Sequence, residues 1–227
     1  MRFDIVGLLP EVLDGFLQFG VCGRAIQNKL AQAEFWNPRD YTTDVHRTTD
    51  DRLYGGGSGM LLMAEPLSLA IDAAKSHNRG RVLYLAPRGE LLTDSVARQI
   101  AGEKEVILLC GRYRGVDERV LETHVDGYLS VGDYVLSGGE TAAMTVMDAV
   151  LRHCPGVLGN ADSPDEEAFV DGLLDAPGYT RPRIWNNREV PKELLSGDHA
   201  AAREWRQQAA ESLTRTCRPD LWARRKK

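Results

Sequence analysis

Two glycine-rich loops, each following a short apolar run, are the part of the chain whose residue types best suit ligand chemistry. The apolar runs are residues 106–110 and 125–129. The loops after them contain Gly111, Gly115, Gly132, Gly138 and Gly139. Short apolar runs bounded by glycine are typical of buried strands, and glycine allows the backbone to approach a ligand closely. Because α/β proteins bind small molecules where strand ends meet helix starts, the two loops predict a ligand site.

Three common motifs for nucleotide binding or hydrolysis are missing from the sequence. No GxxxxGK[ST] phosphate loop occurs. The GxSxG motif around Ser58 is also incomplete, because its last position, which should be glycine, is Met60. The glycines of residues 55–59 do not fit GxGxxG and follow a polar stretch, which argues against a Rossmann dinucleotide turn and a Rossmann-type methyltransferase. A site built from backbone remains, in which loops 84–89, 109–115 and 131–140 would offer N–H and C=O groups to an adenine edge.

The second glycine loop also has the spacing of a helix start. Ser137 and Glu140 lie three residues apart, as in a capping box, so we expect Ser137 to cap a helix over residues 141–153.

The two loops carry a family resemblance. GRYRGVDER (111–119) and VGDYVLSGGE (131–140) resemble segments of the bacterial tRNA (guanine-N1)-methyltransferases, the TrmD family, which act on guanosine 37 beside the anticodon. Similar segments follow one another along nearly the whole chain: YGGGSGM (54–60), LYLAPRG (83–89), PGVLG (155–159), LLDAPGYTRP (173–182) and VPKELLSGDH (190–199).

The resemblance implies a SPOUT-type fold, an α/β domain with a mostly parallel sheet and a deep trefoil knot, which sequence patterns alone would not propose. It also implies S-adenosylmethionine as methyl donor and a homodimer in which one subunit's knot holds the donor while the partner's C-terminal helical domain grips the anticodon stem-loop of tRNA.

The resemblance assigns a donor pocket residue by residue. Its expected lining is Tyr84, Leu85, Pro87, Gly111, Gly115, Val131, Gly132, Tyr134, Leu136, Gly138 and Gly139.

Methylation of guanine N1 requires a base for the N1 proton, a cationic donor for charge developing on O6, and alignment of the methyl group with N1. The resemblance assigns the base role to Glu167 and the O6 donor role to Arg152, with Asp175 supporting the target guanine.

The chain departs from the family twice: Glu167 replaces the usual Asp, and Arg114 replaces the usual Glu. The second change puts a role of that side chain in guanine or Mg²⁺ binding in doubt, so we expect Glu167 and Asp175 to make any contact with Mg²⁺.

Strands that alternate with helices predict a mostly parallel sheet covered on both faces. Expected strands are residues 3–9, 35–41, 81–86, 106–110 and 125–129; expected helices are 11–33 (with an interruption near 20–23), 61–75, 93–101, 141–153 and 199–213. A long loop is expected at 42–59. The predicted organisation is a donor-binding domain (1–159), a flexible acidic linker (160–178) and a helical tRNA-binding domain (179–227).

Composition and charge agree with this division. The hydrophobic content of 43% is enough for a core. Four widely separated cysteines, with no CxxC, predict reduced thiols and no zinc site. The N-terminal apolar run is too short for a membrane span, so we expect a cytoplasmic protein.

The net charge of −5 is unequally divided. Residues 181–227 hold 12 Lys/Arg against 6 Asp/Glu, which suits either an RNA contact or a solvated basic helix.

Two other hypotheses stay open. A knotted ribose 2′-O-methyltransferase is less favoured, because the similarity continues beyond the knot region into the C-terminal segments. An RNA-binding homologue without activity is the non-enzymatic hypothesis, suggested by the departures at Arg114 and Glu167. Binding of S-adenosylmethionine would separate this last hypothesis from the two enzymes.

Overall fold

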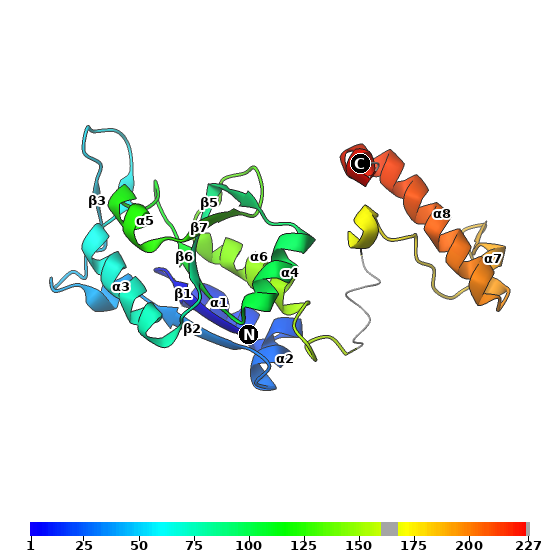
Figure 1. Cartoon of the computed structure of the whole chain (residues 1–227), viewed down its shortest axis with the longest axis horizontal. Helices are drawn as coiled ribbons and strands as arrows, with labels where there is room; N and C mark the ends of the chain where they lie inside the picture. The colour runs from blue at the N-terminus through cyan, green and yellow to red at the C-terminus, as the bar shows by residue number, and fades with distance from the viewer. Residues whose placement is uncertain (160–167, 226–227) are drawn as a thin grey trace. The chain divides into compact units, whose positions relative to one another are not determined.

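The chain consists of two compact units. The computed structural model describes residues 1–159 and 168–225 (Figure 1). Unit 1 spans Met1–Ala161 and unit 2 spans Asp162–Lys227.

Unit 1 is built on a five-stranded parallel sheet, as the sequence predicts. Its strands, in spatial order, are β2 (Gln32–Trp36), β1 (Arg2–Val6), β6 (Glu105–Cys110), β5 (Arg81–Leu91) and β7 (Gly127–Ser130). The central strand β6 is apolar along nearly its whole length, as expected for a strand of a parallel sheet buried on both faces. The threading of the chain implied by the family resemblance stays a prediction.

Helices cover both faces of this sheet (Figure 1). Val106, Leu108 and Cys110 of β6 join one apolar cluster, and Ile107 and Leu109 join the other, because successive strand residues point to opposite faces. The first cluster includes side chains of α1 (Glu11–Gln18), α2 (Gly20–Gln27), α4 (Asp94–Glu103) and α6 (Gly139–Leu151). The second includes side chains of α3 (Ala64–His77) and α5 (Glu118–His124).

A buried carboxylate joins β1 to its surroundings. Asp4 is fully buried and accepts hydrogen bonds from Arg2 Nε (2.7 Å), Trp36 Nε1 (2.7 Å) and Asn78 Nδ2 (2.7 Å). Burial opposes ionisation of Asp4, but the hydrogen bonds from Arg2, Asn78 and Trp36 outweigh it and lower the pKa of the carboxyl. Asp4 is therefore an ionised and saturated structural group.

Several elements differ from the sequence-based expectation. The segment 35–41 is not one strand: β2 ends at Trp36, and the 3-10 turn η1 (Pro38–Tyr41) follows, capped by Asn37, whose side chain accepts the Arg39 N–H. The loop expected at 42–59 contains β3 (Asp50–Arg52), which pairs antiparallel with β4 (Met60–Leu62). Helix α5 was not expected, because its seven residues show too little periodicity.

Unit 2 is mainly helical. It contains the 3-10 turn η3 (Val170–Gly172), a hairpin of β8 (Ile184–Trp185) and β9 (Arg188–Glu189), and the helices α7 (Lys192–Leu195), α8 (His199–Cys217) and α9 (Pro219–Arg225). Helix α8 begins after Asp198, whose carboxylate accepts the N–H groups of Ala200 and Ala201.

The described part of the expected linker, residues 168–178, makes contacts inside unit 2. Leu173 is buried, and the Leu174 N–H donates to Thr214 Oγ1 of α8 at 2.8 Å. Thr214 is itself buried and donates to the Ala210 carbonyl at 2.7 Å. Residues 168–178 therefore belong structurally with α8, and the flexibility of residues 160–175 stays a prediction.

Candidate functional site

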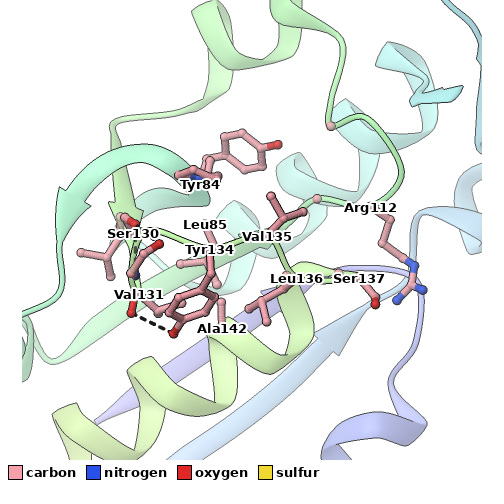
Figure 2. A pocket seen from close by; sticks show the side chains of 18 of the residues that line it. Tyr84, Leu85, Arg112, Ser130, Val131, Tyr134, Val135, Leu136, Ser137 and Ala142 are labelled. Atoms are coloured by element: carbon pink, nitrogen blue, oxygen red, sulfur yellow. Dashed lines mark hydrogen bonds between the residues drawn. The ribbon is translucent and has the colours of Figure 1, made fainter. Parts of the chain in front are cut away.

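A pocket of about 330 Å³ lies where the carboxyl ends of β5, β6 and β7 meet the start of α6 (Figure 2). Three loops enclose it: the bulged end of β5, the loop after β6 and the loop after β7. Its lining residues are Tyr84, Leu85, Ala86, Pro87, Gly111, Arg112, Tyr113, Arg114, Gly115, Leu129, Ser130, Val131, Gly132, Tyr134, Val135, Leu136, Ser137, Gly138, Gly139 and Ala142. A site at the carboxyl edge of a parallel sheet is the usual ligand position in α/β folds.

All eleven residues expected to line a donor pocket lie around this one cavity. Most of the lining residues not named from the sequence are their neighbours in the same loops. Ala142 is the exception, because it reaches the pocket from the first turn of α6, where it is nearly buried. Helical spacing after Gly138 could have indicated it, since residues three and four apart lie on one helix face.

The two glycine loops are bonded to each other. The Gly139 N–H donates to the Gly111 carbonyl at 2.8 Å. A Cβ at Gly139 would stand 2.6 Å from Cys110 Cα and 3.0 Å from the Gly111 nitrogen. Glycine is therefore required here by the close approach of two backbones, one at each side of the pocket floor.

The predicted capping box at the start of α6 is wrong. The helix begins at Gly139, its N-cap is Gly138, and no side chain caps it. Glu140 is instead buried, where its carboxylate accepts the Leu8 N–H at 3.3 Å and faces Arg112 Nη1 at 3.2 Å. Because these partners take the carboxylate, it is not available to reach back to the helix start. Glu140 ties the end of β1 to the loop after β6.

Tyr84 forms one wall of the pocket. Its ring is buried, and burial raises the pKa of its phenol, so it is neutral at physiological pH. A Cβ at Gly111 would lie 2.7 Å from the Tyr84 hydroxyl oxygen, so this glycine makes room for the phenol. Behind it, Tyr128 packs edge to face against Tyr84 with 6.2 Å between ring centroids.

The loop after β7 is held by short-range hydrogen bonds. The Tyr134 hydroxyl donates to the Val131 carbonyl at 3.0 Å, the bond drawn as a dashed line in Figure 2. The Gly132 N–H donates to Ser130 Oγ at 3.2 Å, and Gly132 has a φ of +149°, which few other residues adopt. The Tyr134 ring is thereby folded over its own loop, so the loop presents a defined surface to a ligand.

Arg114, the residue that departs from the family pattern, bridges two loops. Its Nη1 lies 3.4 Å from the Ser58 carbonyl oxygen, and a Cβ at Gly59 would collide with its Cγ at 2.6 Å. Its backbone N–H donates to the Met60 carbonyl at 3.0 Å. Arg114 therefore attaches the glycine loop 55–59 to the pocket rim.

The expected catalytic residues lie elsewhere in the chain. Arg152 is the C-cap residue of α6, and exposed Asp175 belongs to unit 2. Glu167 lies outside the described residues. Arg152, which belongs to unit 1, does not line the pocket of that unit. Among residues 1–159 and 168–225, no group of three or more His, Cys, Asp or Glu side chains is placed to hold a metal ion.

With this geometry established, comparison with known proteins gives the family. The model of the family described as tRNA (Guanine-1)-methyltransferase TrmD matches residues 1–224. The chain belongs to this family. Relatives called tRNA (guanine-N(1)-)-methyltransferase also match along both units, as the family model does. The relative from Pectobacterium atrosepticum is 50% identical over 97% of this chain and 89% of its own length. That from Shewanella sediminis is 50% identical over 97% and 92%, and that from Pasteurella multocida is 49% identical over 97% and 91%.

None of the helices in the described part of this TrmD-family chain has the length and apolar character needed to cross a membrane.

Proposed function

We propose that this protein transfers a methyl group from S-adenosylmethionine to N1 of guanosine 37 in tRNA, beside the anticodon. The observation that carries the proposal is the gathering of all eleven expected donor-site residues around one pocket in a chain of this family. The relatives at about 50% identity, whose name states guanine N1 of tRNA as their target, support the reaction.

The pocket fits the donor. Its volume of about 330 Å³ falls within the range of small-molecule sites. Glycine backbones line one side and apolar side chains such as Leu85, Val131 and Ala142 line another, so an adenine ring finds both polar edges and an apolar surface. When bound, S-adenosylmethionine supplies an electrophilic methyl group on a sulfonium. The protein's task is to orient that group toward guanine N1 and to exclude water.

Catalysis in this proposal depends on residues outside the pocket. Glu167 removes the N1 proton, Arg152 donates to O6 as negative charge develops there, and Asp175 supports the target guanine. Since Arg152 belongs to the same unit as the donor pocket but does not line it, and since the family resemblance implies a shared site, we propose a homodimer in which one subunit's pocket is completed by its partner. Contact of Mg²⁺ with Glu167 and Asp175, and a cytoplasmic location, stay predictions.

Single-turnover methyl transfer across pH tests the catalytic assignment. Glu167→Gln is expected to lose roughly 10²–10⁴ in rate, as is typical for a missing general base. Glu167→Asp is expected to keep substantial activity, because the carboxylate is retained. Arg152→Ala should lower the rate of methyl transfer by a comparable factor, because the charge that develops on guanine O6 then lacks its donor. Affinity for S-adenosylmethionine should be nearly unchanged in all three variants. A Gln variant with the wild-type rate would remove Glu167 from the base role.

Nucleoside analysis of tRNA after the reaction distinguishes the alternatives. The proposal expects 1-methylguanosine. A 2′-O-methylated ribose would instead identify a knotted ribose methyltransferase. The substitutions at Arg114 and Glu167 keep a second candidate, an inactive RNA-binding homologue, which predicts neither donor binding in calorimetry nor a methylated product.

A further inference from the structure

Charge around the pocket of unit 1 is confined to one of its loops. Among the described residues that line the pocket, the charged ones are Arg112 and Arg114, both in the loop after β6, and none is acidic. Val131 in the loop after β7 and Ala142 in α6 belong to an apolar side. Figure 2 shows Arg112 across the cavity from Val131. The pocket therefore has a cationic side and an apolar side.

The two arginines differ in whether the protein neutralises them. Arg112 Nη1 lies 3.2 Å from a carboxylate oxygen of the buried Glu140, so an internal carboxylate balances its charge. Arg114 is exposed, and its Nη1 lies 3.4 Å from the Ser58 carbonyl oxygen, which is not charged. Within residues 1–159 and 168–225, the guanidinium group of Arg114 makes no ion pair. Because a guanidinium group has five N–H donors, most of those on Arg114 remain for a ligand.

The chemistry of the donor determines which of its groups this guanidinium can bind. S-adenosylmethionine carries two positive groups, the sulfonium and the α-ammonium, and one negative group, the α-carboxylate of its methionine part. An uncompensated guanidinium repels the first two and attracts the third. The two oxygens of a carboxylate also match the planar fork of guanidinium donors. A free arginine at the pocket rim therefore favours one orientation of the donor, with the carboxylate toward the loop after β6.

We infer that Arg114 binds the α-carboxylate of S-adenosylmethionine and thereby orients the donor in the pocket. The inference rests on the proposed function for the identity of the donor. With the methionine part held at the loop after β6, the adenine ring is left to the apolar side formed by Val131 and Ala142. The contact is particular to this chain, because the Glu that is usual at this position would repel the same carboxylate.

The test is calorimetry on the full-length protein with S-adenosylmethionine and with decarboxylated S-adenosylmethionine, which differ in the carboxylate alone. The wild type is expected to bind S-adenosylmethionine roughly tenfold more tightly, near the lower end for a hydrogen bond to a charged group. Arg114→Gln is expected to bind the two ligands about equally. Gln keeps an N–H donor for the Ser58 carbonyl, so the glycine loop 55–59 stays attached while the charge is lost. Arg114→Lys should keep part of the preference, because it retains the charge without the bidentate fork.

Arg79→Gln is the matched control. Arg79 is an exposed arginine that comes just before β5, whereas the pocket lies at the carboxyl end of that strand. This variant should keep the full preference of the wild type for S-adenosylmethionine. An equal loss of preference in Arg79→Gln would overturn the inference, because the general charge of the protein would then explain the effect.

The remaining outcomes separate this contact from its alternatives and from the proposed function. A full preference in Arg114→Gln would overturn the inference and move the carboxylate to the start of α6, which no side chain caps. Equal weakening of both ligands would also overturn it, because Arg114 would then act through the glycine loop 55–59. A wild type that shows the preference but never methylates tRNA would defeat the proposed function and still support the contact. A wild type that binds neither ligand would overturn both.

Discussion

The Gly139 N–H donates to the Gly111 carbonyl at 2.8 Å, and this bond joins the loop after β6 to the start of α6 beside the pocket that both glycines line. No side chain fits between the two backbones, since a Cβ at Gly139 would stand 2.6 Å from Cys110 Cα. The pocket's geometry therefore depends on a glycine that packs against the protein backbone as well as lining the pocket.

Gly139→Val is expected to weaken S-adenosylmethionine binding at least roughly tenfold, because the added side chain separates the loops or strains the packing by about 1–3 kcal/mol. Calorimetry measures the affinity, and sedimentation checks that the proposed dimer persists. Gly102→Ala is the matched control: its Cβ would meet nothing within 4 Å, and alanine suits helix α4 better than glycine. Unchanged donor affinity in a folded Gly139→Val protein would take this loop out of the site.

Arg114→Glu is expected to loosen the glycine loop 55–59. The substitution removes the donor to the Ser58 carbonyl and places a carboxylate near that oxygen. Loss of a hydrogen bond of about 1 kcal/mol corresponds to about fivefold faster amide exchange in the loop. Arg114→Gln, which keeps an N–H donor without the charge, serves as the control. Identical exchange in wild type and Arg114→Glu would show that the loop does not depend on this contact.

Asp4→Asn is expected to destabilise unit 1 by about 3 kcal/mol at pH 7, at the low end for breaking a buried ion pair. The folded-state pKa of Asp4 lies below its ordinary value, so its contribution is complete above pH 3.8 and is lost as pH falls through the folded-state pKa. Urea unfolding at pH 7 and below pH 3.8 should therefore show a gap between wild type and variant that narrows in acid. Exposed Asp133→Asn is the control, with little change at either pH. A gap that stays constant with pH would contradict an ionised Asp4.

Thr214→Val is expected to destabilise unit 2 by about 1–3 kcal/mol, because the Leu174 N–H then has no acceptor. Donor binding by unit 1 should be unaffected. Amide exchange at Leu174, which should accelerate, is the direct measurement. Thr216→Val is a suitable comparison, since the exposed Thr216 hydroxyl only donates back to the Ser212 carbonyl within α8. Slow exchange at Leu174 in the Thr214 variant would mean that residues 168–178 are held by other contacts.

Local patterns in the sequence were sufficient to predict the strands of the sheet and the loops that line the pocket of unit 1. The apolar run of β6 and the glycines on either side of β7 are consecutive residues whose types directly reflect burial and close backbone approach. The same local reasoning missed helix α5, whose seven residues are too short for a periodic signal. It also misassigned Ser137 and Glu140, because a capping-box spacing does not reveal competing partners from elsewhere in the chain.

By itself the sequence determined the alternation of strands and helices, the loops that line the pocket of unit 1, and the contrast between the acidic residues 1–180 and the basic residues 181–227, since each depends on residues near one another along the backbone. Only the tertiary structure decided the partners. Glu140 meets the Leu8 N–H across 132 residues, Arg114 meets Ser58 across 56, and Leu174 meets Thr214 across 40. Such contacts follow from how the elements pack, and packing brings together groups whose positions no local periodicity records.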